Sequence, residues 1–118
     1  MITESTTRKI GEVDIVDISG RLSLGNTLLS IERSILNLIE QGSRRLVLNI
    51  PGLISIDSAG IGMLMGCSGQ MEQKQGKLRI AGAQGRIART FEVVHMDRVA
   101  ALDTDLDTAC RALERSGS

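Results

Sequence analysis

Strand-like apolar runs alternate with helix-length segments along this chain of 118 residues. The runs are rich in Val, Ile and Leu, and the segments between them repeat apolar residues at helical spacing. This alternation predicts an α/β fold with a mixed, mostly parallel sheet of about four to five strands, joined by right-handed crossovers and flanked by helices. The predicted strands are residues 6–10, 13–18, 46–50, 78–81 and 99–102, and the predicted helices are residues 26–41, 58–75, a segment from 84 or 85, and 104–115.

The first two predicted strands form a hairpin in this scheme. Gly11 and Glu12 separate them, so the first strand lies antiparallel at an edge of the sheet. The apolar pattern of residues 13–18 predicts a strand with one face more buried than the other. We expect a single domain spanning residues 1–118, with a core of about residues 7–112 and short flexible termini.

Charge and aromatic content argue against several classes of function. The 14 Lys and Arg residues balance 14 Asp and Glu residues, so the chain lacks the basic excess of a nucleic-acid-binding protein. Phe91 is the only aromatic residue, which argues against base-stacking or sugar-stacking surfaces. No apolar run approaches membrane-spanning length, and residues 1–11 lack the apolar region of a signal peptide. We expect a cytoplasmic protein without membrane insertion, whose oligomeric state the sequence leaves open.

Cysteine and histidine, two frequent metal ligands, are sparse in this chain. Cys67 and Cys110 lack metal-ligand spacing and are expected in the core, and His95 is the only histidine, so no catalytic triad is predicted. Residues 103–114 resemble a calcium loop, but Thr108 stands where the turn requires glycine. The glycines of residues 60–66 resemble a dinucleotide fingerprint, yet they follow the strand-to-helix turn instead of forming it. We therefore expect no metal, no cofactor and no enzymatic activity.

The sequence IDSAGIGML, residues 56–64, leads from the apolar strand at 46–50 into a helix. Ser58 falls at the N-cap or in the first turn of that helix, beside unpaired N–H groups and the positive end of the helix dipole. A serine at such a position either caps the helix or offers a hydroxyl where a phosphate is electrostatically favourable. On the residues alone, a plain cap is the commoner explanation.

The helix that begins at Ser58 has two unlike faces when it is drawn at about 3.6 residues per turn. Exposed glycines in a helix cost about 1 kcal/mol each relative to alanine. Their presence indicates either that the backbone of a partner approaches closely or that they pack inside the fold, and periodicity leaves both explanations open. The expected inner face carries Ile61, Leu64, Met65, Ser68 and Met71, and the outer face carries Gly62, Met63, Gly66, Gly69, Gln70 and Gln73.

Several segments resemble the STAS-domain anti-sigma factor antagonists. Asp57-Ser58-Ala59-Gly60, followed by Gly62, resembles the family's DSxG signature at the start of a helix rich in small residues. The resemblance covers roughly residues 7–112 and implies a STAS fold. Residues 13–22, 45–50, 76–82 and 91–99 resemble, in turn, the family's second strand with the following turn, its central strand, its next strand and its late helix.

The resemblance implies a regulator that switches partners. In the family, the unphosphorylated protein binds an anti-sigma factor, which is also an ATP-dependent serine kinase, and thereby frees a sigma factor. Phosphorylation of the serine, here Ser58, switches the protein off, and a serine phosphatase is a further implied partner. The implied partner surface comprises Arg21, Ser23, Asp57, Ser58, Ala59, Gly60, Gly62, Met63 and Gly66.

One turn departs from the family pattern. Gly20-Arg21-Leu22-Ser23 has Ser23 where the family often has an acidic residue. An alternative function is therefore a STAS module that is never phosphorylated, either a scaffold in a signalling complex or an accessory subunit of a transport ATPase. A third reading is a small nucleotide-dependent protein that uses the glycines of residues 60–66.

Overall fold

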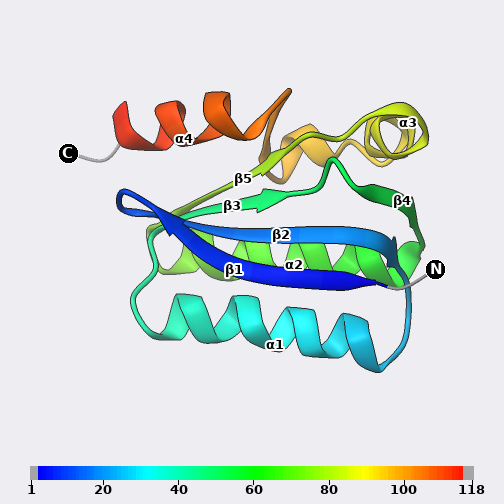
Figure 1. Cartoon of the computed structure of the whole chain (residues 1–118), viewed down its shortest axis with the longest axis horizontal. Coiled ribbons are helices and arrows are strands. Elements are labelled where there is room, and N and C mark those ends of the chain that lie inside the picture. The colour runs from blue at the N-terminus through cyan, green and yellow to red at the C-terminus, as the bar shows by residue number, and fades with distance from the viewer. Residues whose placement is uncertain (1–2, 116–118) are drawn as a thin grey trace.

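The computed structural model describes residues 3–115 and shows a six-stranded sheet with helices on both faces (Figure 1). The strand order is β1-β2-β3-β5-β6, and β4 pairs with the end of β2. Only β1 and β2 are antiparallel among these pairs. The predicted α/β class with a mostly parallel sheet is confirmed, with one strand more than expected. The strands are β1 Glu4–Ile10, β2 Val13–Leu22, β3 Arg45–Asn49, β4 Leu53–Ile56, β5 Lys77–Ala81 and β6 Ala101–Asp103.

The termini bear on two expectations from the sequence. The flexible ends that we expect fall partly on residues 1–2 and 116–118, which lie outside the described residues. A single domain spanning the whole chain stays a prediction. Within residues 3–115, no helix combines the length and the apolar character needed to cross a membrane.

Helices connect the parallel strands and cover the sheet (Figure 1). α1, Asn26–Glu40, and α2, Ser58–Gln73, lie on one face, whereas α4, Leu106–Arg115, lies on the other. α3, Gly85–Val93, and the 3-10 helix η1, Met96–Arg98, link β5 to β6. The alternation of elements in the sequence therefore corresponds to helical crossovers between neighbouring parallel strands.

Strand β2 is buried on both faces. This corrects the expectation that one face would be more buried than the other. Val13 and Ile15 pack into the cluster beneath α4, whereas Val16 and Ile18 pack into the larger cluster beneath α1 and α2. All four side chains are at most 1% exposed. The reason is that helices cover both sides of a central strand, so the apolar residues of each parity find a core.

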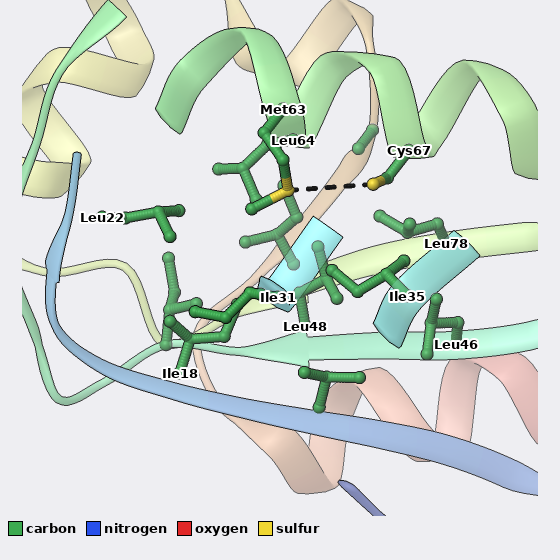
Figure 2. Close-up of a cluster of buried hydrophobic side chains, with 14 of the residues drawn as sticks. Ile18, Leu22, Ile31, Ile35, Leu46, Leu48, Met63, Leu64, Cys67 and Leu78 are labelled. Atoms are coloured by element: carbon green, nitrogen blue, oxygen red, sulfur yellow. Dashed lines mark hydrogen bonds between the residues drawn. The ribbon is translucent and has the colours of Figure 1, made fainter. Parts of the chain in front are cut away.

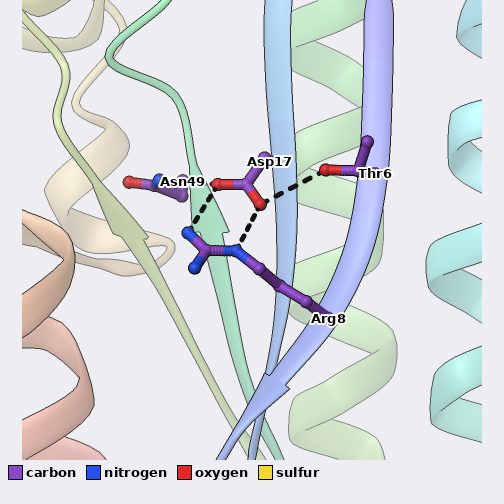
Figure 3. A network of polar contacts seen from close by, with 4 residues as sticks. All are labelled: Thr6, Arg8, Asp17 and Asn49. Atoms are coloured by element: carbon purple, nitrogen blue, oxygen red, sulfur yellow. Dashed lines mark hydrogen bonds and ion pairs between the residues drawn. The ribbon is translucent and has the colours of Figure 1, made fainter.

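Polar contacts hold the exposed edge strand β1 to its neighbours (Figure 3). Arg8 Nε donates to Asp17 Oδ2 at 2.7 Å, and Arg8 also donates to Asp17 Oδ1 at 3.1 Å. The Asn49 amide of β3 donates to Asp17 Oδ1 at 2.8 Å. The hydrogen bond from Arg8 is the main cause that lowers the pKa of Asp17 below its usual value. Asp17 thus links β1, β2 and β3 on the face of the sheet that α4 covers.

Helix α2 turns a different stripe toward the core than its periodicity predicted (Figure 2). Leu64, Ser68 and Met71 are buried as expected, but Met63, which we expected on the outer face, is only 3% exposed. The Cys67 thiol donates to Met63 Sδ at 3.7 Å, and burial raises the pKa of Cys67 to about 12. The physical reason is that α2 packs against both the sheet and α1, so its buried stripe is shifted toward α1.

Candidate functional site

Ser58 owes its position to an extension of the sheet. After β3 the chain turns and forms β4, which runs parallel to the last residues of β2. Gly20, at a φ of +87°, marks a shift of register in β2, and its N–H donates to the Gly52 carbonyl at 3.0 Å. The N–H of Asp57 donates to the Leu22 carbonyl at 3.3 Å, so the start of α2 is fixed to the end of β2.

Asp57, and not Ser58, caps helix α2. Asp57 Oδ1 accepts the N–H of Gly60 at 2.9 Å, and Asp57 Oδ2 accepts the N–H of Leu24 at 3.0 Å. The backbone hydrogen bonds from Leu24 and Gly60, in that order of size, hold the pKa of Asp57 below its usual range. One carboxylate therefore joins the turn between β2 and α1 to the first turn of α2.

Ser58 is the first residue of α2, and its side chain is exposed. Within residues 3–115, no hydrogen-bond partner for its hydroxyl occurs. The explanation of Ser58 as a plain N-cap is wrong, because Asp57 occupies that position. A free hydroxyl thus lies at the positive end of the helix dipole, where added negative charge is favourable.

Two members of the expected partner surface lie inside the molecule. Gly60 is buried, and a Cβ atom at Gly60 would lie 2.3 Å from the carbonyl oxygen of Leu22. Met63 packs in the core beneath α2. Their expected role as surface contacts is therefore wrong, because the first turn of α2 lies directly against the end of β2.

Other members of the expected surface do face solvent. Gly62 and Gly66 are exposed, and nothing lies within 4 Å of the position that a Cβ atom would take at either residue. Arg21 and Ser23 are exposed at the end of β2 and just after it, and Ala59 is partly buried. The hydrogen bond from Leu24 to Asp57 places the β2–α1 turn, with Ser23, beside the start of α2.

Sequence reasoning missed two features of this end. Leu24 is 76% exposed although its backbone is tied to Asp57. The available signal was a leucine between Ser23 and Gly25, in a turn that is otherwise small and polar. The dual hydrogen bonding of Asp57 had no sequence signal, because it depends on a contact between segments 33 positions apart.

The other patterns in the sequence have structural roles here. The glycines of residues 60–66 lie inside α2, unlike the turn glycines of a dinucleotide-binding loop. Asp105 Oδ1 accepts the N–H of Thr108 at the start of α4, and Asp103 pairs with Arg79 at 2.7 Å. Across residues 3–115, no three His, Cys, Asp or Glu side chains are grouped as metal ligands.

Comparisons with known proteins agree with this architecture. A family model described as STAS domain matches residues 4–109. The anti-sigma-B factor antagonist of Staphylococcus aureus is 28% identical over 78 residues, which cover 66% of this chain and 71% of that protein. The structure of an anti-sigma factor antagonist from Mycobacterium paratuberculosis has a TM-score of 0.84 at 18% identity, covering 96% of this chain and 95% of that one. The phosphorylated form of the Bacillus cell fate determinant SpoIIAA has a TM-score of 0.74 at 18% identity, covering 92% of this chain and 98% of that one.

Proposed function

The chain belongs to the STAS domain family, and from this membership we propose that it is an anti-sigma factor antagonist that switches partners. Its unphosphorylated form binds an anti-sigma factor that is also a serine kinase, and this binding frees a sigma factor. Phosphorylation of Ser58 by that kinase ends the binding, and a serine phosphatase restores it. The chain acts in the cytoplasm as a binding protein without enzymatic activity.

The free hydroxyl of Ser58 is the observation that carries this proposal. Asp57 already satisfies the N–H of Gly60, so Ser58 is not needed as a cap. Its side chain is exposed at the first position of α2, where a kinase can reach it. A serine that caps its helix would have to give up that hydrogen bond in order to be modified.

A phosphate at Ser58 suits the fold but changes the surface. It adds roughly −1.5 to −2 charges and three acceptor oxygens. The N–H groups and the dipole at the start of α2 accommodate this charge, so the fold changes little. The neighbouring Asp57 carboxylate adds to the negative charge, and a partner surface that fits a neutral hydroxyl then meets an anion.

The partner surface in this proposal is formed by Arg21, Ser23, Asp57, Ser58, Ala59, Gly62 and Gly66, of which Asp57 and Ala59 are partly buried. Gly62 and Gly66 follow Ser58 at successive intervals of four residues, so this row along α2 carries no side chain between Ser58 and Gln70. A bare helix side lets the backbone of a partner approach closely. Ser23, in place of an acid, makes the contact at this turn a neutral one.

Co-purification from the native host tests the proposal. The tagged chain is captured, its partners are identified by mass spectrometry, and Ser58 is examined for phosphate in the same sample. We expect an anti-sigma factor with a kinase domain, and phosphate on Ser58 in the fraction that is free of that factor. Recovery of a signalling scaffold or a transport ATPase, with Ser58 unmodified, would instead support a STAS module that is never phosphorylated.

A further inference from the structure

Leu24 is a large apolar side chain held out in solvent next to the start of α2. It is 76% exposed, yet its N–H donates to Asp57 Oδ2 at 3.0 Å. Single exposed apolar residues are normal on protein surfaces, so exposure alone means little. Leu24 differs because its backbone is fixed, and a contact residue that is ordered beforehand loses less conformational entropy on binding.

Apart from Asp57 and Arg21, the two segments that meet at Leu24 lack charged residues. Charged residues make up 24% of the chain, but none occurs in residues 22–31 or 58–71. These two segments meet where Asp57 joins the β2–α1 turn to α2. Away from those two residues, a charged group of a partner would be desolvated without a counter-charge, which is costly. Apart from Asp57 and Arg21, the surface around Leu24 and Ser58 therefore complements a neutral, apolar partner surface.

We infer that Leu24 is the apolar anchor of the partner surface and inserts into an apolar pocket of the anti-sigma factor, while Asp57 positions it. The inference rests on the proposed function and names the kind of contact that this function uses. It also gives phosphorylation a second effect. A phosphate on Ser58 repels the Asp57 carboxylate and competes for the N–H of Gly60, so it loosens the bond that holds Leu24.

The positioning role is tested without any partner by Asp57→Asn. Asparagine caps helices about as well as aspartate, so its amide oxygen can still accept the N–H of Gly60. The NH2 group that replaces Oδ2 is a hydrogen-bond donor, so it cannot accept the N–H of Leu24. We expect hydrogen exchange at the Leu24 amide to become about tenfold faster, while amides inside α2 keep their protection. Asp105→Asn, the matched change at the cap of α4, leaves the Leu24 amide unchanged. Unchanged exchange at Leu24 in Asp57→Asn overturns the positioning role.

The anchor role is tested by Leu24→Ser, with the anti-sigma factor identified by co-purification as the probe. Val93→Ser is the matched control, because Val93 is 74% exposed on α3. We expect Leu24→Ser to weaken binding at least about tenfold and Val93→Ser to change it less than about twofold. Wild-type affinity of Leu24→Ser, alongside weak binding of Ser58→Asp, overturns the anchor and leaves the proposed function standing. If Leu24→Ser changes only the self-association of the chain, measured by sedimentation, then Leu24 contacts a second copy of this chain. That result also overturns the anchor role.

A different conclusion follows if the wild-type chain binds no anti-sigma factor. That result overturns the proposed function and the anchor together, whereas the exchange measurement on Asp57→Asn is unaffected by it. The two failures are therefore distinguishable.

Discussion

Asp57 and Ser58 are neighbours with separate roles at the start of α2. The Asp57 carboxylate accepts two backbone N–H groups, from Gly60 and from Leu24. Ser58 is thereby released from capping, and its exposed hydroxyl has no hydrogen-bond partner among residues 3–115. The sequence left open which residue caps α2, because both Asp and Ser are common N-caps. The structure assigns the cap to Asp57.

The first prediction concerns substitutions of Ser58. We expect Ser58→Ala to bind the anti-sigma factor as the parent protein does and to accept no phosphate. Ser58→Asp places a negative charge on the neutral surface, so binding should weaken at least tenfold, on the order of 1.4 kcal/mol. The thermal unfolding midpoint should be almost unchanged in both variants, because neither removes a hydrogen bond or a core contact. Isothermal titration calorimetry and thermal unfolding measure the two quantities.

Two outcomes contradict this prediction. One is modification of another residue by the cognate kinase in the Ser58→Ala variant. The other is parent-like affinity of Ser58→Asp. Ser55→Asp, on the neighbouring strand β4, is a control for negative charge that is not at the helix start.

The second prediction concerns Gly60. A Cβ atom there would lie 2.3 Å from the Leu22 carbonyl oxygen and 2.8 Å from Ile56 Cγ1. We expect Gly60→Ala to lower the free energy of unfolding by roughly 1–3 kcal/mol, because backbone atoms must move apart. Urea denaturation measures the change, and a variant as stable as the parent would show that the end of β2 can shift freely.

At the scale of elements, α2 combines a buried side with an outer side that lacks side chains at Gly62 and Gly66. The third prediction is that Gly62→Gln or Gly66→Gln raises the free energy of unfolding by up to about 1 kcal/mol, because helix propensity improves where space is open. Binding to the anti-sigma factor should nevertheless weaken, since the new side chain occupies the space of the partner's backbone. Denaturation and titration of the same variants separate the two effects, and loss of stability would contradict the open space around these glycines.

The sequence predicted the elements better than it predicted their packing. Long periodic segments such as α1 were placed correctly, because their apolar stripe repeats over several turns. Strand β4 was not among the predicted strands, since four residues are too few for a period and its pairing with β2 depends on the shift at Gly20. Met63 was assigned to the wrong face because contact of α2 with α1 widens its buried side, and no local pattern encodes that contact.

The candidate site was predictable to a similar degree. The position of Ser58 at the start of a helix followed from local signals, and the structure agrees. The assignment of Gly60 to the surface failed because its neighbour is the carbonyl of Leu22, which is distant in the sequence. Tertiary contacts between the β2–α1 turn and α2 decide which of the predicted residues face a partner.

At the scale of the whole molecule, the two faces of the sheet differ. The face beneath α1 and α2 holds the larger apolar cluster, whereas the face beneath α4 combines a small cluster with ion pairs. Arg8–Asp17 ties the β1 edge, and Arg79–Asp103 ties the β6 edge. The lowered pKa of Asp17 couples the stability of the β1 edge to pH, because this carboxylate pairs with Arg8 in its ionised form.

The last prediction follows from the pKa of Asp17. Its pKa is lowered from 3.8 in the folded chain, chiefly by the hydrogen bond from Arg8, so the folded state binds its proton less readily than the unfolded state. The stability that Asp17 contributes is thus fully present above its unfolded pKa and is lost as the pH falls through the folded value. We expect Asp17→Asn to be less stable than the parent near pH 7 by roughly 1 kcal/mol, and to lose less stability on acidification. Urea denaturation from pH 7 to pH 3 measures this, with Glu40→Gln as a control at an exposed acid. Parallel stability curves for Asp17→Asn and the parent would mean that the ionisation of Asp17 does not hold the β1 edge.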